Sequence, residues 1–317
     1  MKINNLIWLV LIGLILISLS IGASDFSWSA FFQGDESAQL VFMASRFPRT
    51  ISILLAGSSM AVAGLLMQTM TQNHFAAPST VGTVEAAQLG LLLSLFLFPN
   101  PSLFQKMVSA FVTSMIFTVL FLRVFKRLKV TENWYLPLIG IVYSGIIGSL
   151  AQILAYRFNL VQSLSSWLQG SFAMIQTHQY EWLLLNQLIL LVAWRLSSSF
   201  ILLSLGRDTS QTLGLDYQAI EKLALVLISL TTSVTVITVG SLPFIGVIVP
   251  NVVRLYSGDH LSRNIGKIAT VGAVLVLACD MIARLVIRPY EVSVSLILGI
   301  LGSASFIYLL WKGRVHA

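Results

Sequence analysis

Residues 47–72 read FPRTISILLAGSSMAVAGLLMQTMTQ, a run in which Arg49 is the single charged residue. A helix needs about 20 apolar residues to cross the hydrocarbon core of a bilayer. This stretch is therefore predicted to form a membrane-spanning helix. It also carries Gly57 and Gly64, and small residues of this kind let helix backbones approach closely inside a membrane.

The composition of the whole chain extends this interpretation. Hydrophobic residues make up 56% of the 317 residues and charged residues only 10%, whereas a soluble domain has about 25% charged residues. The composition excludes a disordered chain, a disulfide scaffold and a soluble nucleic-acid-binding protein. The net charge of +7 comes from basic residues scattered along the chain, so we expect a lipid bilayer and no nucleic acid as a partner.

Ten apolar ranges are predicted to span the membrane within one all-α polytopic domain, residues 1–317. The ranges are 6–22, 47–72, 80–98, 104–125, 135–156, 181–195, 219–240, 244–256, 265–284 and 292–311. The connections between them are short, and no P-loop pattern GxxxxGK[ST] occurs. The chain therefore has no room for a nucleotide-binding domain of its own.

Lys and Arg side chains predict the orientation, because cytoplasmic loops carry an excess of them. With a cytoplasmic N-terminus, 13 of the 19 Lys and Arg residues lie inside and 6 lie outside. Both termini are then cytoplasmic. The six outer residues are Arg46, Arg49, Lys106, Arg157, Arg284 and Arg288.

The range 244–256 is too short to cross a bilayer alone. Its 13 residues reach about 20 Å as a helix. Pro243 precedes the range and Pro250 lies inside it, so we expect Pro250 to interrupt a broken helix. Broken helices at membrane depth mark transport sites in many carriers, although a simple proline kink gives the same pattern.

Residues 204–222 read SLGRDTSQTLGLDYQAIEK on the predicted cytoplasmic face. Asp208 can cap a short helix that stops at Gly214, because glycine accepts the left-handed conformation after a helix end. Asp216 can cap the next helix. Two short helices joined at a glycine indicate a docking element, although an ordinary surface loop remains the alternative.

Two stretches carry the most specific patterns: SRFPRTISILLAGSSMAVAGLLMQTMTQNHFAAPSTVGT at 45–83 and TVGSLPFIGVIVPNVVRLYSGDH at 238–260. They resemble the FecCD-type permeases, the membrane subunits of ATP-driven importers for ferric siderophores, haem and cobalamin. The matching residues are Arg46, Pro48, Arg49, Leu55, Gly57, Ala63, Gly64, Met67, Gln68, Asn73, Ala76, Pro78, Leu205, Gly206, Leu213, Gly214, Pro243, Phe244, Ile245, Gly246, Val247, Pro250, Asn251, Arg254, Asp280 and Arg284.

The resemblance implies the type II importer fold of ATP-binding-cassette (ABC) transporters and a set of partners. A second permease shares the central path, two ATPase subunits bind ATP and magnesium, and an extracytoplasmic binding protein delivers the substrate. This chain then carries no cofactor and is not an enzyme. Departures from the family pattern, such as His74 after Asn73 and Asn251 after Pro250, favour a heterodimer of permeases over a homodimer.

The resemblance also assigns roles to candidate residues at the two membrane faces. The coupling segment, about 204–220, would contact an ATPase through Leu205, Gly206, Asp208, Leu213, Gly214 and Leu215. Arg46, Arg49 and Arg284 would dock the binding protein, although snorkelling to the interface is the alternative. Asp280 precedes Arg284 by four residues, which favours an ion pair inside the membrane.

Polar or small residues within the spans are candidates for the translocation path. They are Gln68, Gln72, Asn73, Ser144, Gly148, Pro250 and Asn251. Helix packing is the favoured explanation of the small residues at 140, 144 and 148, and interhelical hydrogen bonding explains Gln68 and Gln72 as well as a path does. Glu85 either complements the dipole of its helix or serves proton coupling.

We interpret the chain as a permease of an ABC importer for a ferric siderophore in a bacterial cell membrane. The same role for haem or cobalamin stays open, as does an ion-coupled secondary transporter that uses Glu85 and Asp280. A membrane enzyme lacks a catalytic constellation. Cys279 stands alone, and His74, His178, His260 and His316 have no metal-ligand spacing, so we predict no metal site.

Overall fold

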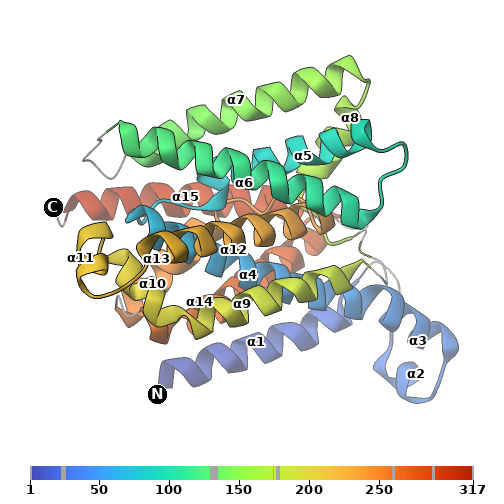
Figure 1. Cartoon of the computed structure of the whole chain (residues 1–317). Coiled ribbons are helices and arrows are strands. Elements are labelled where there is room, and N and C mark those ends of the chain that lie inside the picture. Colours follow the sequence, from blue (N-terminus) through green and yellow to red (C-terminus); the bar gives the residue numbers. More distant parts are fainter. Residues whose placement is uncertain are drawn as a thin grey trace.

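The computed structural model describes residues 2–22, 26–128, 135–173, 175, 179–258, 261–287 and 290–315, and their regular structure is helical (Figure 1). The helices are α1 Lys2–Ser20, α2 Trp28–Phe32, α3 Glu36–Val41, α4 Phe47–Thr71, α5 Thr83–Leu97, α6 Leu103–Arg127, α7 Tyr135–Arg157, α8 Val161–Leu168, α9 Leu184–Arg195, α10 Ser197–Ser204, α11 Arg207–Thr212, α12 Tyr217–Thr238, α13 Ile245–Ser257, α14 Leu261–Leu285 and α15 Val294–Val315. Shorter π- and 3₁₀-helical turns occupy Phe42–Arg46, Pro78–Thr80 and Tyr180–Leu183.

Each of the ten predicted spans coincides with a helix. Within the described ranges, five helices are long and apolar enough to cross a membrane, by length and composition. The pair α9 and α10 makes a sixth if the two are one span bent by 66°. Shorter apolar helices cover Ile7–Ser20, Thr83–Leu97, Ile245–Ser257 and Val294–Tyr308. The predicted span at 181–195 is continuous, and the bend follows it, between Arg195 and Ser197.

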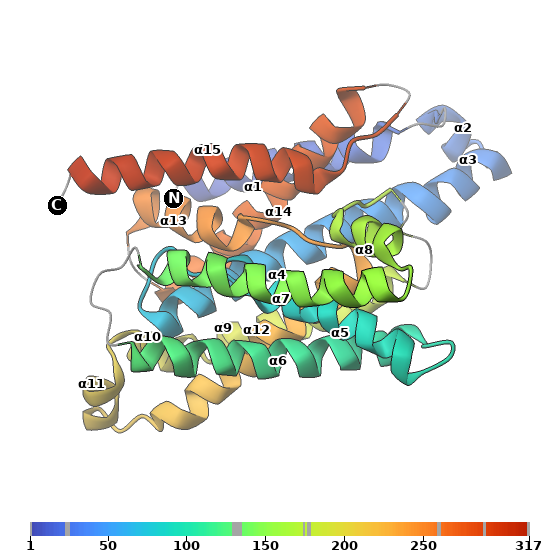
Figure 2. The same ribbon diagram turned by 90° about the horizontal axis from the view of Figure 1, so that it is seen from above.

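The helices lie roughly side by side, with α4 and α12 between α7 on one side and α1 on the other (Figure 1). The beginning of α1, the end of α15 and the short helix α11 share one end of the molecule in both views (Figures 1 and 2). We call this the inner end. The opposite end, which carries α2, α3 and the start of α4, is called the outer end.

Helix α4 forms the centre of the fold and packs against α14, α13, α12 and α9. Nearly all of its side chains are buried. Its small residues permit this packing: a Cβ atom at Gly64 would lie 2.1 Å from Cα of Gly246, and one at Gly57 would lie 2.8 Å from the carbonyl oxygen of Gly272. Close approach of backbones is thus what the small residues of 47–72 provide.

The start of α4 accommodates a proline without a break. Helix α3, the π-helical turn Phe42–Arg46 and α4 follow one another continuously, and Pro48 lies in the first turn of α4. Proline has no N–H and its ring crowds the preceding turn. A π-helical turn widens the helix locally, so the wider turn lies where the proline requires space.

The expected interruption at Pro250 is wrong. Helix α13 runs through Pro250 from Ile245 to Ser257. The break lies earlier, where Val239 to Phe244 leave the helical conformation and Phe244 takes φ of 64°. A neighbouring strand-like segment satisfies this irregular backbone, because the Ser171 N–H donates to the Val239 carbonyl at 3.0 Å and Gln169 pairs with Ser241. Irregular backbone at membrane depth needs such partners.

Candidate functional site

An ion-pair cluster closes the outer end of the helix bundle. The Arg49 guanidinium donates to Oδ1 of Asp280 from Nη2 at 2.8 Å, and its Nη1 lies 2.8 Å from Oε2 of Glu291. Arg284 pairs with the other carboxylate oxygen of Asp280. Two cations and two anions therefore meet where α4, α14 and the segment before α15 come together. Buried charges of this kind persist only when they are paired.

The three docking candidates are not the exposed cations that the sequence analysis expects. Arg46, Arg49 and Arg284 expose only 4%, 9% and 5% of their surface. Arg284 donates to the carbonyls of Ser18 at 3.1 Å and Ile21 at 2.8 Å, at the end of α1. The last carbonyls of a helix have no partner within it, so the guanidinium satisfies groups that would otherwise be unpaired.

Arg46 contacts the end of α1 and an aromatic ring. Its guanidinium carbon stands 5.2 Å from the centre of the Phe26 ring, and its Nη1 donates to the Leu19 carbonyl at 3.4 Å. The predicted pair of Asp280 and Arg284 is confirmed. The sequence analysis misses Glu291, because no spacing links a residue before the last span to a residue in the second. The predicted outer residue Arg288 lies outside the described residues.

A second polar cluster lies toward the inner end, between α4 and α13. Pro250 has no N–H to donate to the carbonyl of Gly246, four residues earlier. The Gln68 side chain on α4 donates to that carbonyl instead, from Nε2 at 3.1 Å. Gln68 thus replaces the hydrogen bond that the proline removes, which explains how α13 stays helical. This hydrogen bond supports the helix around Pro250, while the role of Gln68 and Pro250 in a path stays a prediction.

Two further path candidates, Asn73 and Asn251, belong to the same cluster. Asn251 donates from Nδ2 to the His74 carbonyl at 2.7 Å, and its Oδ1 accepts from Arg254 at 3.0 Å. Asn73 is 3% exposed and accepts from the Phe75 N–H at 2.9 Å. The cluster fixes the chain where it leaves α4. The structure brings these residues together, while their role in a path stays a prediction.

Two more path candidates, Ser144 and Gly148, lie on α7, beside α5. A Cβ atom at Gly148 would lie 4.0 Å from Cγ of Glu85. Glu85 Oε2, Gln88 Nε2 and Ser144 Oγ are buried without a hydrogen-bond partner among the described residues. Ser144 and Gly148 therefore belong to a helix face that packs on α5, and Glu85 stands close to it.

The predicted coupling segment forms two helices that meet at a glycine. Gly214 has φ of 84°, as expected for the residue after a helix end, and the Asp216 carboxylate caps α12 by accepting from the Ala219 N–H at 3.1 Å. The predicted Asp208 cap is wrong. Helix α11 begins after Gly206, without a side-chain cap, and Asp208 lies in its first turn. An acid there complements the positive helix end.

The coupling segment exposes apolar side chains and is tied to α4. Leu205 is 50% and Leu213 is 56% exposed, whereas Leu215 is half-buried. Gln72, which ends α4 with φ of 52°, donates from Nε2 to the Ser204 carbonyl at 3.2 Å. Gln72 therefore joins the central helix to the coupling segment, a role that sequence reasoning missed because the partner is a backbone atom.

Metal and redox chemistry find little support in the described residues. No group of three His, Cys, Asp or Glu side chains that could hold a metal ion occurs among them. His178, His260 and His316 lie outside the described residues, so the absence of a metal site stays a prediction. Cys279 is fully buried in α14.

These features define a class of protein. The chain is a polytopic helical membrane protein, closed by ion pairs at its outer end and carrying an exposed two-helix segment at its inner end. Comparison with known proteins then gives the family. Residues 9–312 match the model of the FecCD transport family, and the chain belongs to this family. It is therefore a transport component.

Named relatives and a solved structure agree with this assignment. The chain is 39% identical over 317 residues to the petrobactin import system permease protein YclN of Bacillus subtilis, with 100% of both chains covered. It is 34% identical to the ferric-anguibactin transport system permease protein FatD of Vibrio anguillarum, over 93% of this chain and 94% of the relative. A solved inward-facing transporter, assigned to the metal-chelate type of ABC transporter, superposes with a TM-score of 0.81 at 26% identity, over 98% and 99% of the two chains.

Proposed function

We propose that the chain is a permease subunit of an ABC importer that carries a ferric siderophore across the bacterial cell membrane. The observation that carries the importer role is the inner two-helix segment with exposed Leu205 and Leu213, tied to α4 through Gln72. Exposed apolar side chains on an ordered segment indicate a protein partner. The names of the relatives, for petrobactin and ferric anguibactin, support the choice of cargo over haem or cobalamin.

The proposal includes four kinds of partner. A second permease, more readily a paralogue than an identical copy, shares the path. Two ATPase subunits hold ATP and magnesium, so this chain needs no cofactor. A binding protein delivers the cargo to the outer end. The apolar residues Ile141, Val142, Ile146 and Ile153 on α7 are more than half exposed, which supports a surface that lipid or the second permease covers.

Docking of the binding protein through Arg46, Arg49 and Arg284 requires a change of partners. Arg49 and Arg284 are paired within the chain, so acidic groups of a binding protein have to replace Asp280 or Glu291 there. Arg46 has to leave its contacts with Phe26 and the Leu19 carbonyl. Glu291 is the more replaceable partner, because its side chain is 21% exposed and that of Asp280 is 0% exposed. The exchange would fix register and association rate more than affinity.

The orientation is also part of the proposal. The excess of Lys and Arg on one side places both termini and the coupling segment in the cytoplasm. Single cysteines at Asp208 and Ser165, both exposed in the structure, test this in a Cys279→Ala background. A membrane-impermeant maleimide should label position 165 in intact cells and position 208 only after permeabilisation. Labelling of both in intact cells would refute the orientation.

One experiment tests the function. The tagged chain is purified from its own membrane, the co-purifying proteins are identified, and the complex is reconstituted into liposomes with its binding protein. We expect ATP-dependent uptake of ⁵⁵Fe-labelled siderophore, with petrobactin as the first probe. Uptake driven by a proton gradient without ATP would favour a secondary transporter, and ATP-dependent uptake of haem or cobalamin alone would correct the cargo.

A further inference from the structure

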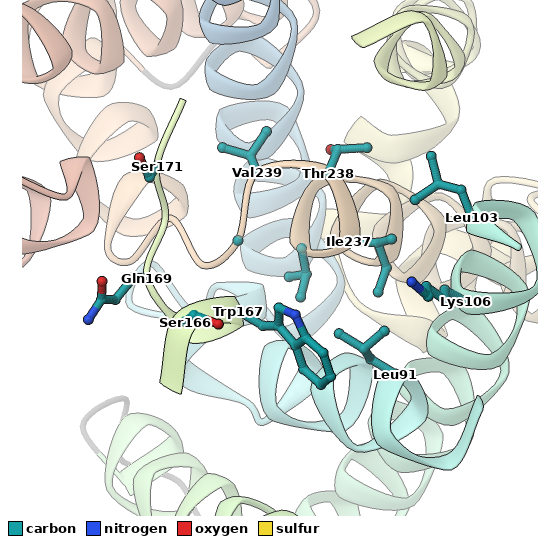
Figure 3. Close-up of a pocket in the computed structure, with 12 residues that line it drawn as sticks. Leu91, Leu103, Lys106, Ser166, Trp167, Gln169, Ser171, Ile237, Thr238 and Val239 are labelled. Atoms are coloured by element: carbon teal, nitrogen blue, oxygen red, sulfur yellow. The ribbon is translucent and has the colours of Figure 1, made fainter. Parts of the chain in front are cut away.

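A cavity of about 350 Å³ opens near the outer end, away from the ion-pair cluster. Its walls come from α5, α6, α8, the last turn of α12 and the irregular link after it (Figure 3). Leu91, Leu103 and Ile237 form an apolar part, and Trp167 contributes an indole ring. Figure 3 shows the Lys106 side chain directed from α6 toward the space between Trp167 and Ile237.

Lys106 differs from the outer arginines. Arg49 and Arg284 are neutralised by Asp280 and Glu291. The Lys106 ammonium has neither a hydrogen bond nor an ion pair within the part of the chain that the structure describes. The side chain is only half-buried, so its ammonium keeps water until a ligand arrives. An unneutralised cation in a walled space attracts an anion more strongly than one on an open surface.

Two backbone carbonyls beside the cavity already accept hydrogen bonds from other groups. Carbonyls at the end of a helix would be natural acceptors for the Lys106 ammonium. Two of those at the end of α12 are already engaged, because Val236 accepts from the Gly240 N–H at 3.1 Å and Val239 accepts from the Ser171 N–H at 3.0 Å. Because the Lys106 ammonium has no partner among the described residues, it is available for a group from outside the chain.

We propose that this cavity is a binding site for one anionic, ring-bearing arm of the cargo, such as a catecholate or an aromatic carboxylate. Lys106 supplies the charge, the indole of Trp167 supplies a stacking face, and Leu91 with Ile237 covers the apolar edge of the ring. The volume lies at the lower end of the range of about 300–1,000 Å³ for small-molecule sites. One arm of a chelate fits, whereas the whole complex does not.

The proposal rests on the proposed function for the identity of the cargo alone, and its test is a direct measurement of binding. Ser166 lines the cavity and Ser165, the preceding residue on α8, does not. Each is replaced by cysteine in a Cys279→Ala background, within the intact transporter in nanodiscs of zwitterionic lipid. The probe is 2,3-dihydroxybenzoate, and its neutral counterpart is 2,3-dihydroxybenzamide. The rate of maleimide labelling is recorded against probe concentration.

We expect the acid to slow labelling of Ser166→Cys, the amide to have a much weaker effect, and Ser165→Cys to respond to neither. Adding Lys106→Gln should raise the half-protecting concentration about tenfold, because a hydrogen bond to a charged group is lost. Lys106→Arg should retain protection. An unchanged labelling rate of Ser165→Cys in the Lys106 variants shows that α8 keeps its structure.

Three results would overturn the proposal. They are no protection of Ser166→Cys by the acid, equal protection by acid and amide, or protection that appears only in membranes containing phosphatidylglycerol. The last result would assign the cavity to an anionic lipid headgroup. Uptake separates this proposal from the proposed function. If Lys106→Gln raises KM for ferric siderophore with kcat unchanged, cargo uses the cavity. If uptake never occurs but protection does, the function fails and the site stands.

Discussion

The outer ion-pair cluster and the inner coupling segment differ in which side chains are buried and which are exposed. At the outer end, Arg49 and Arg284 are buried and neutralised by Asp280 and Glu291 within the same chain. At the inner end, Leu205 and Leu213 are at least half exposed. The charges of the outer ion-pair cluster are thus neutralised within the chain, whereas the coupling segment exposes apolar side chains of the kind that a protein partner covers. Variants at the two ends should therefore differ in kind: outer ones change stability, and inner ones change coupling.

The largest effect is expected at Asp280. Asp280→Ala leaves Arg49 and Arg284 buried next to each other without their shared anion, and loss of one partner of a buried pair costs about 3–5 kcal/mol. Thermal unfolding of the detergent-purified complex measures the loss. Glu291→Ala is the matched control, since it removes another acceptor of Arg49 whose side chain is partly exposed. Equal effects of the two variants would contradict the central role of Asp280.

A smaller loss of stability is expected at Gln68. Gln68→Leu removes the donor that replaces the missing N–H of Pro250 and leaves the Gly246 carbonyl buried without a partner, which costs about 1–3 kcal/mol. Pro250→Ala restores a backbone N–H at that position. The double variant should therefore lose less stability than the sum of the two single variants, measured by the same unfolding assay. Simple additivity would mean that the hydrogen bond contributes nothing.

The coupling segment should respond differently. Gly214→Val places a β-branched residue at φ of 84°, with a strain of about 1–2 kcal/mol. Gly34 near the outer end also has φ of 85°, and an added Cβ finds open space at both glycines. The two valine variants should lose similar stability. Only Gly214→Val should abolish stimulation of ATP hydrolysis by the loaded binding protein.

Two outcomes would contradict the expected difference between Gly214→Val and Gly34→Val. If Gly34→Val also abolishes stimulation, the effect belongs to strain in general. If Gly214→Val keeps full stimulation at wild-type amounts of assembled complex, the two-helix segment plays no part in coupling.

The smallest effect is expected for the ion pair of Lys126 with Glu221, at the inner ends of α6 and α12. The Lys126 side chain is 55% exposed, and such pairs contribute about 0–1 kcal/mol. Lys126→Gln should lower the unfolding temperature slightly in low salt, and added salt should remove the difference because it screens exposed charges. A loss as large as that of Asp280→Ala would contradict the contrast between exposed and buried pairs.

The amino-acid sequence by itself determined the membrane-spanning class, the positions of the spans, the Asp280–Arg284 pair and the glycine turn at Gly214. These properties depend on local composition, on helical spacing or on a backbone conformation that only glycine adopts easily. The family patterns follow from the same residues. Such information is contained within a few turns of one helix, which is why it can be read without the fold.

The tertiary structure alone decided how distant residues meet. Arg49 finds Glu291 across 242 positions, and Gln68 finds the Gly246 carbonyl across 178. It also decided that the outer arginines are buried while Lys106 is left unneutralised, and that α13 continues through Pro250. The physical reason is that charge pairing and hydrogen-bond replacement depend on which atoms come within 3 Å of each other, and helix packing sets that distance independently of separation along the chain.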